Sequence, residues 1–426
     1  MDWYRRPMVQ VKPIRTPAAA GASQVRRSAK RDKVLDVGGR LLNNQGAAGI
    51  SLAEIAEQLG MSRNALYYYV KDRADLVRQC YDRAIDAIEA DLCAVSSSGR
   101  SAPDQINEFI RLSLSPDRAQ LAVLADIDTL DEAGRIEILA RHERQIDAFK
   151  KILISGQKEG VFRPLDPELA SYALFGMMNW SRLWIGWLNE HESAANDRRL
   201  EAVRAIQDIF LDGLCSRPHP DFACDLDYAQ LTHQHYNVFE KSDANRLRQQ
   251  QLIEAASLLF NRRGLDGVST DAIAEAVGAS KGVVYHHFKD KAELIQQCHE
   301  RAFQHYEMII EVAEKRGGDP LQNMLIVFHL NCQAQASASP PLILQPGLMR
   351  LPTQYLDRAR QISLKMTKSL VQAGNAGLVR THAPEIVNVS AGAFFWIQKW
   401  RGDRAGMSAR SIADQMTQLM ISGIRS

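Results

Sequence analysis

The chain repeats part of itself without a gap. Residues 51–84 align with residues 269–302, 218 positions later, and 15 of the 34 aligned pairs are identical. Many of the differences are conservative, such as Arg63 against Lys281. Solenoid repeats have periods of roughly 20 to 50 residues, so the much longer period here indicates duplication of a whole domain. We therefore expect two equivalent halves, each large enough to build its own core.

The composition is that of a globular protein. Of 426 residues, 46% are hydrophobic and 24% are charged, with a net charge of +2. No apolar run approaches the roughly 18 residues of a membrane-spanning helix, and the N-terminus does not read as a secretory signal. The six cysteines are sparse and lack a CxxC spacing, which favours reduced thiols. These features predict a cytoplasmic protein with no membrane partner.

Positive charge is concentrated at the N-terminus. Residues 3–30 contain seven basic side chains and no acidic one. Pro13, Pro17 and the run of small residues over 18–23 leave little to bury, so residues 1–30 are predicted to be a mobile basic arm. The arm is either a solvated tail or a segment that contacts phosphates, and both interpretations stay open.

Each copy of the repeat predicts a helix-turn-helix. Helical spacing of apolar residues predicts a first helix over about 31–46 and its twin over about 245–264. Two short helices follow in each copy, because a serine cap, a glycine stop and a second serine cap occur in close succession. These positions are Ser51, Gly60 and Ser62 in the first copy and Ser269, Gly278 and Ser280 in the second.

The remainder of each half predicts long amphipathic helices, so the fold class is expected to be all-α. We expect larger helical domains over residues 86–214 and 304–426, with helix-turn-helix domains over 31–85 and 244–303. A stretch with prolines and mixed polar residues, 215–243, is predicted to be the linker between the halves.

The second short helix of each copy has the features of a helix that reads the major groove. Such a helix exposes polar side chains from its first turns and anchors its other face in a core. In the first copy Leu66 and Val70 are predicted to be buried, and in the second copy Val284 and Phe288. The outward positions are then Arg63, Asn64, Tyr67 and Tyr68 in the first copy and Lys281, Gly282, Tyr285 and His286 in the second.

The shared run is Ile-Ala-x-x-x-Gly-x-Ser-Arg/Lys-x-x-x-Tyr-x-x-Val/Phe-x-x-Arg/Lys-x-x-Leu, and it resembles the DNA-binding domain of the tetracycline-repressor (TetR) family. The resemblance implies two tandem TetR-like units, each with a larger helical domain for ligand binding and dimerisation. The first copy departs from the usual family pattern at Asn64, where a small residue is common, and at Val70, where phenylalanine is common.

The resemblance also assigns roles to residues. It implies that tyrosine and lysine side chains grip phosphates, whereas residues at the start of the reading helix lie nearest the bases; helix starts and serine hydroxyls also suit phosphates. The predicted DNA-binding residues are Ser51, Ser62, Arg63, Asn64, Tyr67, Tyr68, Lys71, Ser269, Thr270, Ser280, Lys281, Gly282, Tyr285, His286 and Lys289.

The larger helical domains are rich in aromatic and sulfur-containing side chains. Such stripes form ordinary core or subunit interface in many proteins, and a ligand pocket is the alternative that the resemblance favours. The candidate pocket residues are Tyr172, Phe175, Trp180 and Trp184, which suit an apolar or acyl ligand.

Metal and catalytic sites are not predicted. His219, Cys224, His233 and His235 lie close together in the linker, but their spacing matches no zinc-finger pattern. The chain has no GxSxG, HExxH, Walker or dinucleotide-binding motif. We therefore expect no cofactor and no enzymatic activity.

Together these features predict a sequence-specific transcriptional regulator, a repressor that a small ligand releases from an operator in double-stranded DNA. One chain would supply both reading heads as an intrachain pseudo-dimer, and further homodimerisation is compatible with this arrangement. Because residues 63–64 and 281–282 differ, the two half-sites need not be palindromic. The alternative is a ligand-binding or protein-interaction scaffold in which one or both helix-turn-helix units no longer bind DNA.

Overall fold

The structure, a computed structural model, describes residues 17–187, 192–216, 222–233, 240–347, 352–380, 383–401 and 406–426. Over these ranges the chain is helical, and its only extended pairings are two isolated β-bridges. The fold is all-α, as predicted, and it consists of two tandem helical units.

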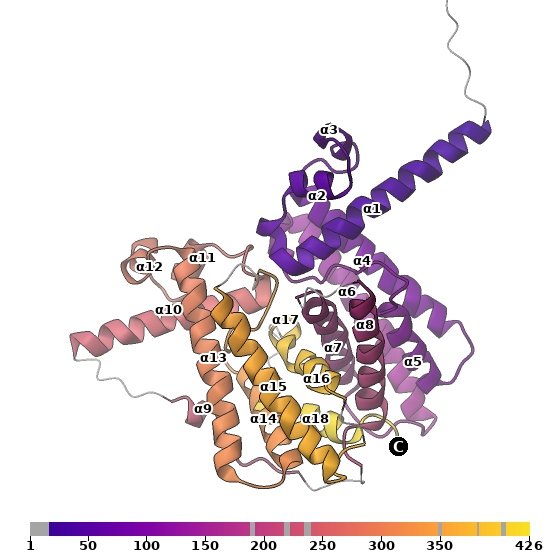
Figure 1. The fold of residues 1–426 in the computed structure, drawn as a ribbon. Coiled ribbons are helices and arrows are strands. Elements are labelled where there is room, and N and C mark those ends of the chain that lie inside the picture. Colours follow the sequence, from indigo (N-terminus) through magenta and orange to yellow (C-terminus); the bar gives the residue numbers. More distant parts are fainter. Residues whose placement is uncertain are drawn as a thin grey trace, which may run out of the picture.

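The first unit runs from α1 to η2. Its elements are α1 (Pro17–Gly49), α2 (Leu52–Gln58), α3 (Arg63–Leu66), α4 (Arg73–Ser96), α5 (Ala102–Ser113), η1 (Ile127–Thr129), α6 (Glu132–Lys158), α7 (Pro167–Trp187), α8 (Glu192–Gln207) and η2 (Asp208–Asp212). In Figure 1 they occupy the indigo and magenta part of the molecule.

The second unit repeats this order. After the short α9 (Tyr228–Leu231) come α10 (Lys241–Arg263), α11 (Thr270–Ala276), α12 (Lys281–His287), α13 (Lys291–Arg316), α14 (Pro320–Gln335), α15 (Thr353–Asn375), α16 (Glu385–Phe395), α17 (Ile397–Arg401) and α18 (Ala409–Ser422). Helices α10–α12 thus correspond to α1–α3, and α13–α15 correspond to α4–α6.

Helix α1 already begins at Pro17, so residues 17–30 of the predicted arm are its first turns, and a mobile basic arm over residues 1–30 stays a prediction. Proline suits the first position of a helix, and the alanines at 18–20 have the highest helix propensity, so this segment needs no core to favour a helix. The helix projects from the body of the molecule in Figure 1. The first 16 residues lie outside the described ranges. Gly46 adopts a φ of 73° and interrupts α1 where the sequence predicted its end.

The predicted linker is partly packed against the second unit. Cys224 and Tyr228 are buried in a cluster that includes Ile309 and Leu330, and the Tyr228 hydroxyl lies 2.6 Å from Nδ1 of His305. These residues between the units therefore belong to the core of the second one.

The two units meet along α7 and α16, which lie side by side in the middle of the molecule (Figure 1). A Cβ atom added to Gly176 would lie 2.4 Å from the carbonyl oxygen of Gly392. A Cβ atom added to Gly392 would lie 2.6 Å from the carbonyl oxygen of Gly176. The backbones touch at this crossing, and the contact is the same in both directions.

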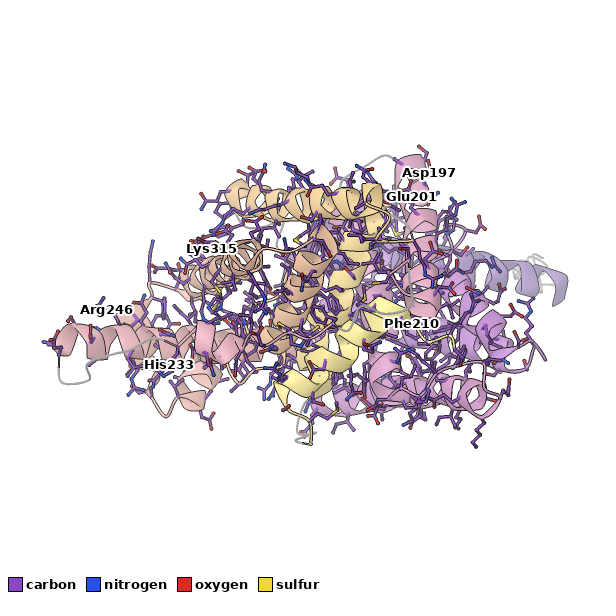
Figure 2. The ribbon with its side chains drawn as sticks, turned by 90° about the horizontal axis from the view of Figure 1, so that it is seen from below. Asp197, Glu201, Phe210, His233, Arg246 and Lys315 are labelled. Carbon is purple, nitrogen blue, oxygen red and sulfur yellow. The ribbon has the colours of Figure 1, made fainter. Side chains whose placement is uncertain are left out.

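The last residues of the units pair in the same reciprocal way. The amide of Leu214 donates to the carbonyl of Met420 at 2.8 Å, and the amide of Ile424 donates to the carbonyl of Phe210 at 3.0 Å. The two β-bridges, Phe162 with Arg425 and Cys215 with Val379, repeat the exchange. Figure 2 shows Phe210 beside the yellow α18. The two units therefore contribute equivalent surfaces to the interface between them.

A buried carboxylate, Asp126, lies where the first unit meets the second. Its Oδ2 atom accepts a hydrogen bond from the Ala47 amide at 3.0 Å, while Asp266 of the second unit accepts one from the Ala48 amide at 2.7 Å. Burial raises the pKa of Asp126 to about 6, and the nearby Asp266 carboxylate adds to the rise. Burial likewise lowers the pKa of Lys399, whose Nζ donates to the Ala125 carbonyl at 2.8 Å, to about 8.

We expect Asp126→Asn to alter how stability depends on pH. The pKa of Asp126 in the folded protein, about 6, lies above the value of about 3.9 in an unfolded chain. The contribution of Asp126 to the stability of the wild-type protein is therefore complete below about pH 4 and is lost as the pH rises through about 6. The loss in free energy of unfolding is on the order of 3 kcal/mol. Relative to wild type, the variant should gain about that much free energy of unfolding between pH 4 and 7, measured by urea denaturation. Exposed Asp117→Asn is the control, and a pH-independent difference for Asp126→Asn contradicts the prediction.

Candidate nucleic-acid interface

The first head, residues 31–85, builds its turn from two capped helices. The Ser51 hydroxyl accepts a hydrogen bond from the Glu54 amide at 3.4 Å and so caps α2. Gly60 then adopts a φ of 60°, a left-handed conformation that glycine favours, and lets the chain reverse. The Ser62 hydroxyl accepts from the Ala65 amide at 3.2 Å at the start of α3. The predicted helix-turn-helix is therefore present.

The second head, residues 244–303, has the same geometry. The Ser269 hydroxyl accepts from the Ala272 amide at 3.1 Å at the start of α11, and Gly278 has a φ of 64°. Ser280 occupies the N-cap of α12 without a capping side-chain hydrogen bond. Helix α12 extends over Lys281–His287, whereas α3 covers only Arg63–Leu66 before the chain continues as turns.

Both reading helices keep an apolar face in the core and present aromatic rings to solvent. Leu66, Val70, Val284 and Phe288 are buried, as predicted. The side chains on the other face include three unusually exposed aromatics, Tyr67 at 54%, Tyr68 at 60% and Tyr285 at 49%. Exposed tyrosines beside a helix start are suited to contact a nucleic-acid backbone.

The remaining predicted contacts are exposed, with one exception. Those exposed are Ser51, Ser62, Arg63, Asn64, Lys71, Ser269, Ser280, Lys281, Gly282, His286 and Lys289. Thr270 is buried, and its hydroxyl lies 3.4 Å from the hydroxyl of Tyr285. Thr270 therefore lies beneath the exposed face, beside Tyr285, and its role in DNA binding stays a prediction.

The two heads differ in the charge that their reading helices present. Lys281 Nζ forms an ion pair with Asp271 Oδ2 at 2.9 Å, and this hydrogen bond raises the pKa of the lysine. The position equivalent to Asp271 in the first head is Ala53, which has no charge. Within the described part of the chain Arg63 has no such carboxylate partner. The first head therefore presents a free cation where the second presents a neutralised one.

A large cavity of about 730 Å³ lies in the second unit rather than the first. Trp180 and Trp184, two of the four candidate pocket residues, line it together with Trp187, which was not among the candidates; that they bind a ligand stays a prediction. The three tryptophans follow one another at i, i+4 and i+7, the spacing of one helix face. That spacing was the sequence signal for Trp187.

Two predicted pocket residues lie elsewhere. Tyr172 precedes Trp180 by eight residues, which is roughly 12 Å along a helix axis. Its ring stacks on that of Trp400, with the ring centroids 4.8 Å apart. Phe175 points toward the core of the first unit, where its ring lies 5.8 Å from that of Phe109 and 6.1 Å from that of Phe149. Neither residue lines the cavity.

In the described ranges, no helix is long and apolar enough to cross a membrane. Over the same residues, no three His, Cys, Asp or Glu side chains are grouped so that they could hold a metal ion. Of the linker residues considered as ligands, His219 and His235 lie outside the described ranges, and Cys224 is buried.

An all-α chain with two such heads has the architecture of helix-turn-helix proteins. Comparison with known protein families identifies which helix-turn-helix family the chain matches. Residues 34–80 and 252–298 each match the family of bacterial regulatory proteins described as the tetR family. Residues 103–186 match the tetracyclin repressor-like C-terminal domain. The chain belongs to the tetR family and carries two of its units in tandem.

Individual relatives match one unit or part of one. The HTH-type transcriptional regulator AcrR of Shigella flexneri is 35% identical over 82 residues, which are 19% of this chain and 38% of AcrR. The HTH-type transcriptional repressor KstR2 of Mycolicibacterium smegmatis is 23% identical over 189 residues, 42% of this chain and 90% of KstR2.

Solved structures match a similar share of the chain. The ketosteroid transcriptional regulator KstR2 of Mycobacterium tuberculosis aligns with a TM-score of 0.36 and 19% identity, over 42% of this chain and 95% of that one. The regulator PfmR from Thermus thermophilus aligns with a TM-score of 0.33 and 21% identity, over 40% and 97%.

Proposed function

We propose that this protein is a sequence-specific DNA-binding transcriptional regulator, and that it acts as a repressor released by a small ligand. The observation that carries the proposal is the pair of exposed reading helices, α3 and α12, on one chain. Each is anchored by buried residues and presents tyrosine and basic side chains outward. The name of the relative KstR2, a transcriptional repressor, favours repression over activation.

The two units act as an intrachain pseudo-dimer in this proposal. Support comes from the glycine crossing of Gly176 with Gly392 and from the reciprocal pairing of the unit ends. Such an arrangement presents two heads to half-sites about one helical turn apart, roughly 34 to 36 Å. The cytoplasmic location, further homodimerisation and the domain boundaries at 31–85 and 244–303 stay predictions.

Selection from a random DNA pool, followed by substitution of the heads one at a time, tests the proposal. We expect an enriched fragment whose affinity falls about tenfold with Tyr67→Ala, about tenfold with Tyr285→Ala, and more steeply with both, because each tyrosine serves one half-site. Val161→Ala, at an exposed position after α6, is the control.

The same experiment discriminates the alternative scaffold function. If selection enriches no fragment, the chain is not a sequence-specific DNA-binding protein. If only one tyrosine substitution weakens binding, the other head does not read DNA and the two-headed proposal fails.

A further inference from the structure

The cavity exists because four phenylalanines of the first unit have smaller or more flexible counterparts in the second. In the first unit the rings of Phe109, Phe149, Phe175 and Phe210 are linked by contacts between neighbours, including Phe149 with Phe210 at 6.2 Å. These rings fill the space between α5, α6 and α7.

The counterparts follow from structural landmarks shared by the units. Counted from the N-caps Ser101 and Asp319, Phe109 corresponds to Val327. Counted from the left-handed glycines Gly160 and Gly377, Phe149 corresponds to Met366.

The other two pairs follow from the interface between the units. Counted from the Gly176–Gly392 crossing, Phe175 corresponds to Ala391, and the reciprocal hydrogen bonds pair Phe210 with Met420. All four counterparts line the cavity: Val327, Met366, Ala391 and Met420. The first unit is therefore filled where the second is open.

The first unit nevertheless contributes to the wall. Trp180, Trp184 and Trp187 of α7 line the cavity, although they belong to the first unit. Trp180 and Trp184 are only 5% and 7% exposed, and their indole Nε1 groups have no hydrogen-bond partner in the described part of the chain. A buried donor without a partner costs free energy, which an acceptor on a bound molecule would recover.

The charged residues of the lining are already paired. They are Arg198, which lies 2.6 Å from the Glu385 carboxylate, and Arg360, which lies 3.3 Å from the Asp357 carboxylate. Asn331 lines the cavity as well, with its Oδ1 buried and unpartnered. The lining that the structure describes thus offers neutral donors and an acceptor on an apolar surface, and each of its two arginines already has a carboxylate neighbour.

We infer that each chain binds one effector molecule, in this cavity, and that the effector is an uncharged, largely apolar compound whose ketone or ester oxygen accepts hydrogen bonds from Trp180 and Trp184. The inference rests on the proposed function, of which it specifies the effector. A volume of about 730 Å³ is within the range of sites for small organic ligands, about 300 to 1,000 Å³.

The test uses the full chain without DNA and three probes: 2-dodecanone, progesterone and dodecanoate. We expect at least one of the two ketones to bind with a stoichiometry of one per chain by equilibrium dialysis and to change tryptophan fluorescence. Dodecanoate should bind at least tenfold more weakly than the tighter ketone. Two sites per chain, binding of neither ketone, or tighter binding of dodecanoate would overturn the inference.

Substitutions locate the site. Trp180→Phe and Trp184→Phe keep a ring but remove the N–H group, so each should weaken ketone binding about five- to tenfold. Ala391→Phe restores the ring that the first unit has and should abolish binding, with Met420→Phe as a second filling variant if the first fails to fold. Leu139→Phe, on the surface of α6, is the matched control. Ketone binding unchanged in a folded filling variant would overturn the assignment.

The two proposals can fail separately. A chain that binds ketone but enriches no DNA fragment loses the regulatory function and keeps the ligand site. If the folded filling variants still bind the selected DNA and do not respond to ketone, both proposals are supported.

Discussion

Gly176→Ala should lower the free energy of unfolding by about 2 kcal/mol, although alanine favours helices over glycine. The added methyl group would lie 2.4 Å from the Gly392 carbonyl oxygen, which is backbone and cannot rotate away. Overpacking of this kind costs about 3 kcal/mol, and the gain in helix propensity offsets about 1 kcal/mol. Urea denaturation followed by circular dichroism measures the effect.

The reciprocal contact also predicts the stability of the double variant, Gly176→Ala with Gly392→Ala. Gly392→Ala should lower the free energy of unfolding about as much as Gly176→Ala does, because each added methyl group would contact the backbone of the other helix. Once one methyl group has pushed α7 and α16 apart, the second fits more easily, so the two costs should not add. Gly282→Ala in α12 is the control, since the nearest atom would be the Ser280 hydroxyl at 3.7 Å. If Gly176→Ala is as harmless as Gly282→Ala, the helices do not cross here.

The second large effect concerns base reading by the first head. Arg63→Ala should weaken binding to the selected operator by about 10- to 100-fold and relax specificity in one half-site, because an arginine that reads a base contributes roughly 1 to 3 kcal/mol. Lys281→Ala should weaken binding less, since the lysine Nζ already lies 2.9 Å from Oδ2 of Asp271 in an ion pair. Fluorescence anisotropy with one half-site scrambled at a time assigns each loss to a head.

The Asp271 carboxylate supplies the converse experiment. Asp271→Asn releases Lys281 and removes a negative charge that would face phosphates, so the second half-site should be bound several-fold more tightly and with a steeper salt dependence. Ala53→Asp introduces a carboxylate at the matching position of the first head and should weaken the first half-site. If Lys281→Ala costs as much as Arg63→Ala, the pairing with Asp271 does not persist on DNA.

The features that the sequence predicted well are encoded locally. Serine caps, glycine stops and the spacing of Leu66 with Val70 are set within a few residues, so both helix-turn-helix units and the all-α class followed from the pattern. The helix over residues 17–30 was not predicted, because the lack of core residues indicated disorder, whereas proline and alanine favour a helix without a core.

The cavity could be predicted only in part, because it depends on packing between units. Trp180 and Trp184 stood out as large aromatics, but their sequence does not say that they enter the other unit. Tyr172 and Phe175 belong to the same stripe, yet Tyr172 stacks on Trp400 and Phe175 packs against the phenylalanines of the first unit. Thr270 is buried beside the hydroxyl of Tyr285, a contact that the sequence pattern does not indicate.

The crossing of Gly176 with Gly392 also has a consequence for how such a protein can change over generations. In a dimer of identical chains, every mutation occurs on both sides of the twofold axis, so a core cannot be filled on one side and emptied on the other. Here each glycine has its own codon, and the first unit has four phenylalanines at positions where the second has valine, alanine and two methionines. In the proposed pseudo-dimer, joining the units would also make their association independent of protein concentration, so that a cell with few copies would still contain assembled pairs of heads.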